Sequence, residues 1–192
     1  MMPRRLWCQS AALAAAWVGT AAASTQVRAE AQGAHWPAGL LAGAETWRFC
    51  GQGTMRFLGW RVYHARLWAV EGFRPEAFVQ TPLALELEYL RAFTAAAIAE
   101  RSIQEMRRQA TFTAAQAQRW QAALATALPD VAVGDRLLGL YRPGQPARFV
   151  HNGRPSGEVS DPQFGPLFFG IWLSDATSEP TLRQALVAGT RP

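Results

Sequence analysis

Arg56, Tyr63, Arg66 and Tyr89 carry side chains that can hold an anion in this 192-residue sequence. The first three lie in an aromatic-rich segment, residues 55–70, and Tyr89 ends the stretch LALELEY. An arginine beside a tyrosine hydroxyl in an apolar cleft can hold a carboxylate or an enolate, because charge-assisted hydrogen bonds strengthen when water is excluded. We therefore take these four as candidate ligand-binding residues. The alternative makes them partly exposed strand residues whose arginine stems cover apolar surface.

The spacing of these residues limits which of them can meet. Along a regular strand Arg56 and Arg66 share one face, while Tyr63 points to the other. Only a bulge, for instance at Gly59, would bring Arg56 and Tyr63 together.

Other chemical motifs fail on their spacing. GQGTMR begins like a dinucleotide-binding loop, but Arg56 stands at the third glycine position and no helix is expected to follow. The three histidines lack metal-ligand spacing, and there is no Gly-x-Ser-x-Gly motif. Glu86 and Glu88 form an acid/base pair only if a cleft covers them; a solvated strand face is the simpler interpretation. We expect no metal and no cofactor.

The N-terminus, MMPRRLWCQSAALAAAWVGTAAAS, has the layout of a cleaved secretory signal: a basic start, an apolar run and small residues. We assign residues 1–29 to this signal, with cleavage after residue 23 or 29, and residues 30–44 to a lead segment. A retained membrane anchor is the alternative, but the apolar run is short beside the ~20 residues that a span needs. The sequence therefore predicts a periplasmic protein with no stable membrane insertion after cleavage.

Cleavage after residue 29 removes Arg4, Arg5 and Arg28 and no acid, so the net charge falls from +5 to +2. A nearly balanced chain lacks the basic stripe that nucleic acid requires, so we expect no nucleic-acid partner. Only Cys50 remains, which leaves no intramolecular disulfide in an oxidising compartment.

Residues 45–190 show the pattern of one α+β domain. The expected strands are 47–50, 55–70, 83–89, 136–142, 147–151 and a short one around Glu158. Glycines at 51, 53 and 59 mark a turn and a possible bulge between the first two, and Asn152-Gly153 marks a hairpin. In LALELEY the leucines and Tyr89 share one face of a half-buried strand.

Helices are expected in two pairs. Thr94 and Thr113 are predicted N-caps for the first pair, and Pro129 ends its second helix. Asp161 is predicted to cap a third helix with Pro162 in its first position, and Pro166 to break that helix before Leu167. The last helix follows Ser178 and ends near Gly189. An antiparallel sheet with helices on one side is the expected architecture.

Three runs of the sequence resemble the bacterial chalcone isomerase-like proteins: GWRVYHARLWA, LELEYLRAFTAAAIAERSIQEMRR and GDRLLGLYRPGQPARFVHNGRPSGEVSDPQFGPLFFGIWLSDATS. The resemblance covers roughly residues 45–188, with FFGIWL and the NG…GE…DP lead-in as its most specific parts. It implies an open-faced β-sandwich, in which a large antiparallel sheet is covered by a layer of helices, with a ligand cleft between them.

The resemblance also bears on function. Plant relatives cyclise chalcones to flavanones, whereas fatty-acid-binding relatives hold lipids in the same cleft. The isomerase residues correspond to the following positions: its arginine to Arg56, its threonine to Tyr63, and its tyrosine and asparagine to Ala97 or Ile98 and Gln104 or Glu105. Because neither Ala97 nor Ile98, the positions that correspond to the isomerase tyrosine, is a tyrosine, true chalcone isomerase activity is not expected.

The helix FGPLFFGIWL adds two candidates, since Phe168 and Trp172 lie on a common helical stripe that can line the cleft. We expect a non-catalytic protein that binds a small apolar or amphipathic ligand such as a fatty acid. The alternatives are an enzyme of unknown reaction that uses Arg56 with Tyr63 or Tyr89, and a structural or partner-binding protein with a filled cleft.

Overall fold

The computed structural model describes residues 46–190, so the predicted signal and most of the lead segment lie outside the described residues. Six strands form a single antiparallel sheet in which each strand pairs with its neighbour in sequence. Their bounds are β1 Trp47–Phe57, β2 Trp60–Val70, β3 Leu83–Tyr89, β4 Arg136–Tyr141, β5 Ala147–His151 and β6 Arg154–Val159. The predicted antiparallel sheet is confirmed.

The turn between the first two strands was placed wrongly by the sequence. It lies at Leu58-Gly59, and Gly51 and Gly53 lie inside β1. These two glycines allow close approach of the helix α5 (Pro180–Leu186), because a Cβ at Gly51 would lie 2.6 Å from the Leu186 carbonyl oxygen. Their role is therefore packing between distant segments rather than turning.

A bulge does interrupt this hairpin, but in β2 rather than at Gly59. Met55 pairs with Tyr63 and Arg56 pairs with Arg61, which leaves Val62 as the extra residue. Beyond this bulge the β2 side chains alternate regularly, so Ala65 and Leu67 face the core.

Strand β3 has the predicted bounds, and Leu83, Leu85, Leu87 and Tyr89 are all part of the hydrophobic core. The opposite face is not simply solvated, because Glu86 is only 5% exposed. Its carboxylate accepts a hydrogen bond from the Arg66 guanidinium at 2.9 Å, which compensates its burial. The half-buried description of this strand is therefore corrected.

The two helices between β3 and β4 begin as predicted. In α2 (Ala95–Met106) the Thr94 hydroxyl accepts from the Ala97 N–H, and in α3 (Ala114–Ala127) the Thr113 hydroxyl accepts from the Gln116 N–H. Each cap satisfies one of the free amide groups of a first turn. Helix α3 ends before Pro129, also as predicted.

Helix α4 (Phe164–Leu173) begins two residues later than predicted, with Gln163 rather than Asp161 at its N-cap. The Asp161 carboxylate instead accepts from the Gln163 N–H at 2.9 Å and the Trp120 indole at 2.8 Å. Pro166 then falls in the first turn, where a backbone N–H has no partner within the helix, so the predicted break before Leu167 is absent.

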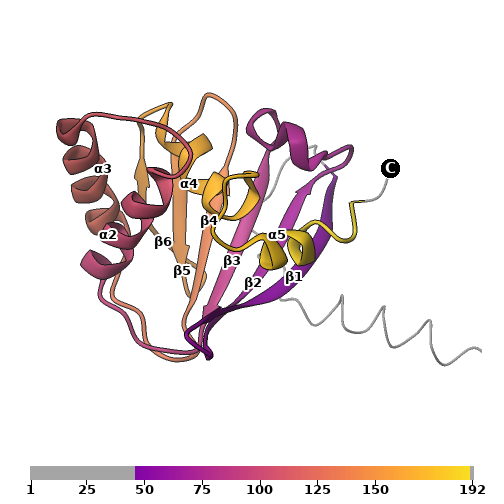
Figure 1. The fold of residues 1–192 in the computed structure, drawn as a ribbon, viewed down its shortest axis with the longest axis horizontal. Coiled ribbons are helices and arrows are strands. Elements are labelled where there is room, and N and C mark those ends of the chain that lie inside the picture. Colours follow the sequence, from indigo (N-terminus) through magenta and orange to yellow (C-terminus); the bar gives the residue numbers. More distant parts are fainter. Residues whose placement is uncertain (1–45, 191–192) are drawn as a thin grey trace, which may run out of the picture. The chain divides into compact units, whose positions relative to one another are not determined.

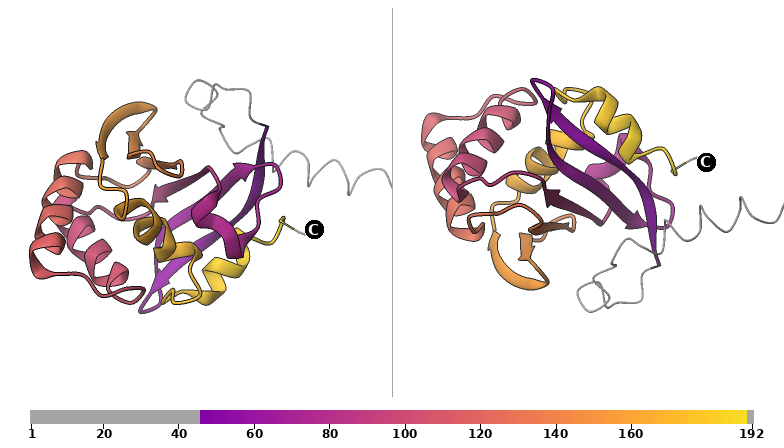
Figure 2. Two further views of the ribbon diagram at one scale, coloured as in Figure 1. Left: turned by 90° about the horizontal axis from the view of Figure 1, so that it is seen from above. Right: turned by 90° about the horizontal axis from the view of Figure 1, so that it is seen from below.

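The helices lie on one face of the sheet, with α4 and α5 in front of the strands and α2 and α3 beyond β6 in Figure 1. Figure 2 shows the same layering from above and below. A 3₁₀ segment, η1 (Pro75–Gln80), connects β2 to β3. Within residues 46–190, no helix combines the length and apolar character that crossing a bilayer requires.

Candidate functional site

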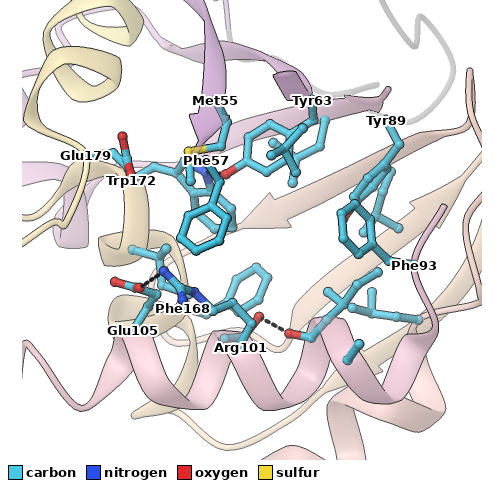
Figure 3. Close-up of a pocket in the computed structure, with 18 of the residues that line it drawn as sticks. Met55, Phe57, Tyr63, Tyr89, Phe93, Arg101, Glu105, Phe168, Trp172 and Glu179 are labelled. Carbon is cyan, nitrogen blue, oxygen red and sulfur yellow. Dashed lines mark hydrogen bonds and ion pairs between the residues drawn. The ribbon is translucent and has the colours of Figure 1, made fainter. Parts of the chain in front are cut away.

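A cavity of about 330 Å³ lies between the sheet and helices α2 and α4, and its wall is mostly apolar. Figure 3 shows its labelled residues around an open centre. The residues lining it are Met55, Phe57, Val62, Tyr63, Leu87, Tyr89, Phe93, Ala97, Ile98, Arg101, Ser102, Glu105, Leu128, Leu137, Phe168, Ile171, Trp172, Ser178 and Glu179. Three of them, Phe57, Ala97 and Arg101, are exposed and mark the opening to solvent.

The sheet side of the cavity is built by β1 to β4. Tyr63 and Tyr89 are cross-strand partners, and their rings pack edge to face with centroids 5.9 Å apart. Because the β2 bulge precedes Tyr63, both Val62 and Tyr63 reach the cavity wall. Leu87 and Leu137, paired across β3 and β4, continue the wall as an apolar surface.

Helix α4 closes another side of the cavity. Phe168, Ile171 and Trp172 line it, and the Trp172 indole N–H donates a hydrogen bond of 3.0 Å to the Tyr63 hydroxyl. The helix is buried almost all round, with Phe164 and Phe169 fully inside the core. This explains the unusually aromatic composition of FGPLFFGIWL: the helix packs on the sheet with one part and forms the cavity wall with another.

Helix α2 brings charged groups to the cavity. The Arg101 guanidinium lies 2.6 Å from the Glu105 carboxylate, one helical turn away, and Glu105 is almost buried. Ser102 lies between them and uses its hydroxyl to bond the Ile98 carbonyl at 2.8 Å. The arginine charge is therefore largely balanced by its own helix.

Glu179 adds a further acid beside this pair, at the start of α5. Figure 3 places Glu179, Trp172 and Glu105 at the same end of the cavity, opposite Tyr89 and Phe93. Burial raises the pKa of the Glu179 carboxyl, and the nearby Glu105 raises it further against the opposing effect of Arg101. Glu105 pairs with Arg101 and lies 3.7 Å from Arg108, which does not line the cavity, so Glu179 is the acid of the cavity wall that forms no ion pair with a described residue.

The Tyr89 hydroxyl stands out among the polar groups of the wall. Tyr89 is 3% exposed and lines the cavity, yet its hydroxyl makes no hydrogen bond with any residue from 46 to 190. Burial raises the pKa of Tyr89, as it does that of Tyr63, so both phenols stay protonated at neutral pH. The hydroxyl oxygen itself is not enclosed, because it faces the open cavity, and it therefore gives a ligand a free hydrogen-bonding position.

The structure brings four of the six predicted site residues together: Tyr63, Tyr89, Phe168 and Trp172 all line the cavity. Arg56 does not. It is exposed near the β1–β2 turn and makes no hydrogen bond or ion pair with a described residue, because the bulge falls at Val62 and leaves the arginine facing solvent.

Arg66 also lies away from the cavity, on the opposite face of the sheet. It bonds the Glu86 and Glu88 carboxylates at 2.9 and 3.0 Å, so it neutralises acids of β3. Strand alternation separates it from Tyr63, as the spacing had indicated.

None of the charged residues of the cavity, Arg101, Glu105 and Glu179, was among the predicted site residues, although Glu105 is one of the two positions that the resemblance assigned to the isomerase asparagine. A signal was present for two of them. Positions 98, 102 and 105 follow a helical spacing, so Glu105 lies at the edge of the apolar stripe with Arg101 one turn before it. Glu179 precedes a short helix and gave no comparable signal.

The arrangement can hold a small amphipathic molecule. The volume falls within the range of about 300–1,000 Å³ that is usual for small-molecule sites, and the wall combines much apolar surface with a few polar groups. The predicted alternative of a filled cleft is therefore wrong for this cavity. The predicted pairing of Arg56 with a tyrosine is not formed, since the Tyr63 hydroxyl bonds Trp172 instead.

Comparisons with known proteins agree with this architecture. The protein-family model described as chalcone isomerase-like matches residues 11–188 of this chain. Among solved structures, the crystal structure of an Arabidopsis thaliana fatty-acid binding protein is similar in fold, with a TM-score of 0.56 at 10% sequence identity. The similarity covers 76% of this chain and 88% of the plant protein. No curated protein matches the sequence at a significant level.

Proposed function

The chain belongs to the chalcone isomerase-like family, and from this premise and the open cavity we propose that it binds a small amphipathic lipid, a fatty acid in the first instance, without transforming it. The observation that carries the proposal is the separation of the wall into a long apolar part and one polar end. Lipid binding in the structurally similar plant protein supports the same ligand class.

The apolar part of the wall fits a hydrocarbon chain. Leu87, Phe93, Ile98, Leu128 and Leu137 contribute aliphatic and aromatic surface without charge. Moving a methylene group from water to such a surface is worth about 0.8 kcal/mol, so several buried methylenes give a substantial affinity.

The polar end fits the head group. The Tyr63 hydroxyl, the Arg101 guanidinium and the Glu179 carboxyl lie on three different elements around it. Arg101 and the Tyr63 hydroxyl can donate hydrogen bonds to a head-group oxygen, whereas Glu179 favours a head group that carries a proton. The ligand is therefore oriented by hydrogen bonds rather than by one strong ion pair.

The test is to fill the cavity without disturbing its frame. Ser102 is 7% exposed and lines the cavity, so Ser102→Phe directs a phenyl ring into the space that a ligand chain needs. Ser102→Ala is the matched control, because it removes the same hydroxyl and adds no volume.

Binding is measured with a fluorescent fatty acid and by native mass spectrometry of the loaded protein. We expect Ser102→Ala to bind as the wild type does and Ser102→Phe to lose at least ten times in affinity, an amount equal to about 1.4 kcal/mol. Equal binding by both variants, with equal melting temperatures, would show that the ligand does not enter this cavity.

A further inference from the structure

The turn between β1 and β2 exposes more apolar surface than any other turn of the described chain. Phe57, Leu58 and Trp60 are 50%, 83% and 66% exposed, whereas most large apolar residues of this domain are buried. Figure 1 shows this turn as the indigo tip at the lower end of the sheet. Contiguous exposed apolar side chains mark interaction sites more often than isolated ones do.

The backbone of the turn makes the exposure of Leu58 unusual. Leu58 and Gly59 both have positive φ, 48° and 82°, which is the pattern of a tight two-residue hairpin turn. Asparagine, aspartate or glycine suits the first of these positions, and a leucine there carries a steric cost. The leucine therefore does not stabilise the turn.

A fourth exposed apolar residue borders the same end of the sheet. Val133, 69% exposed, lies in the loop before β4. Two backbone hydrogen bonds connect this loop to the end of β2. The Gly134 N–H donates to the Tyr89 carbonyl, and the N–H of Leu90, the residue after Tyr89, donates to the Val62 carbonyl. Four of the five large apolar residues exposed in residues 46–190 thus lie at this end.

Basic side chains surround these apolar residues. Arg56 and Arg61 are exposed cross-strand neighbours, and no acid occurs from 54 to 64. Arg91 and Arg101 lie over the Trp60 and Phe57 rings at 5.0 and 5.7 Å.

Two acids lie in the adjoining loop, and each accepts a hydrogen bond from a backbone N–H group. The Asp130 carboxylate accepts from the Ala95 N–H, and Asp135 accepts from the Ala132 N–H. Those hydrogen bonds leave the carboxylate charges in place, and Arg101 is paired with Glu105, so the positive rim of the tip consists of Arg56, Arg61 and Arg91, which form no ion pair with a described residue.

We propose that this tip, defined as Phe57, Leu58, Trp60, Arg56, Arg61 and Arg91, docks on the surface of a bilayer that carries anionic phospholipid. An aromatic and a leucine flanked by arginines suit the interface, where the ring and the aliphatic chain enter the headgroup region and the guanidinium groups meet phosphate. Phe57 belongs both to the tip and to the cavity wall, so docking places the cavity opening against the membrane. The suggestion that this position serves lipid exchange rests on the proposed function. The docking itself is independent of the proposed function.

The test uses the purified protein with vesicles of phosphatidylcholine alone and of phosphatidylcholine mixed with phosphatidylglycerol, in a flotation assay. Leu58→Asn combined with Trp60→Thr removes the two most exposed apolar side chains of the tip and leaves Phe57, which also lines the cavity. The asparagine suits the left-handed turn position, so folding is preserved. Val79→Thr is the control, because Val79 is also exposed but lies on η1, at the opposite end of β2.

We expect wild type and Val79→Thr to float with the anionic vesicles and not with phosphatidylcholine alone. The double variant should lose at least about tenfold in partition, as removal of large apolar side chains from a bilayer contact implies. Arg56→Gln with Arg61→Gln should lose about fivefold for each charge at low salt.

Three results would overturn the proposal. The first is a wild type that does not float with anionic vesicles, and the second is a double variant that floats as well as the wild type. The third is a wild-type dimer in size-exclusion chromatography that Leu58→Asn converts to a monomer, which would make the tip an interface between two copies. Fatty-acid binding in vesicle-free solution separates this test from the proposed function, since neither Leu58 nor Trp60 lines the cavity.

Discussion

Replacing Glu179 by glutamine tests the charge at the polar end of the cavity. Arg101 is paired with Glu105 at 2.6 Å, so Glu179 is the acid at this end that lacks a basic partner. A fatty-acid carboxylate placed there meets a like charge. The substitution keeps the shape of the side chain and removes that charge.

The size of the effect follows from Coulomb's law. Two unit charges 4 Å apart repel by about 1 kcal/mol in water and about 4 kcal/mol at an effective dielectric constant of 20. Glu179 is only partly buried and Arg101 is exposed at the cavity opening, so solvent screening makes the lower value appropriate. Glu179→Gln should therefore bind hexadecanoate about five times more tightly than the wild type at neutral pH.

The pH dependence follows with a definite sign. Burial and Glu105 raise the pKa of Glu179, so this carboxyl takes up its proton at a higher pH than an ordinary glutamate. As the pH falls from neutral through that range, the wild type should gain affinity and approach the variant. Titration of the free ligand carboxyl is common to both proteins and cancels in their affinity ratio.

The assay is a displacement titration of a fluorescent fatty acid, with two controls. Glu100→Gln removes the same charge from the exposed face of α2, outside the cavity, and should change nothing. Hexadecanol, which has the same chain and no charge, should bind wild type and Glu179→Gln equally. Unchanged or weaker hexadecanoate binding by Glu179→Gln would refute the reasoning and make Glu179 a partner of the head group.

Three further predictions concern stability and export. Tyr63→Phe leaves the Trp172 indole N–H without its partner and should lower the free energy of unfolding in urea by about 1–3 kcal/mol, and Trp172→Phe in the same chain should recover part of this loss. Hydrogen bonds from a backbone N–H and Asn152 lower the pKa of Asp135, so its contribution to stability is present at neutral pH and lost as the pH falls through the lowered value; Asp135→Asn should flatten the melting temperature in that acidic range. Intact-mass analysis of the exported chain should give a mature N-terminus at Ser24 or Glu30, and a chain that keeps Met1 would contradict export by cleavage.

Much of the fold was predictable because its determinants are local. The alternation from Leu83 to Tyr89, the threonine caps and the Asn152-Gly153 turn each depend on a few neighbouring residues, and each was confirmed. The Asn152 φ of 49° is the conformation that such a turn demands.

The errors came from contacts between distant segments. A glycine in a strand and a glycine in a turn look alike in sequence, and only the packing of α5 distinguishes Gly51 from Gly59. The same applies to Pro166, since its effect depends on where the helix begins, and that start is set by the bonds that hold Asp161 to Trp120.

The residues of the candidate site also separate into those that local sequence patterns predicted and those that they did not. Tyr63 and Tyr89 were chosen for the chemistry of their hydroxyl groups, and the β2–β3 register places them together; Phe168 and Trp172 were found because helical spacing aligns them. Arg56 was misplaced because a bulge at Val62 cannot be read from residue types alone.

The Tyr89 hydroxyl argues that the cavity serves a ligand. In a core selected for packing alone, a phenylalanine at position 89 would remove an unpaired hydroxyl at no loss of a hydrogen bond. The tyrosine is retained at 3% exposure, facing a space bounded on its other side by helix α2. A molecule that occupies this space and bonds the hydroxyl would fill the cavity and gain a hydrogen bond, so binding and stability should rise together. Tyr89→Phe should therefore leave the melting temperature of the ligand-free protein nearly unchanged and weaken the stabilisation that a ligand provides.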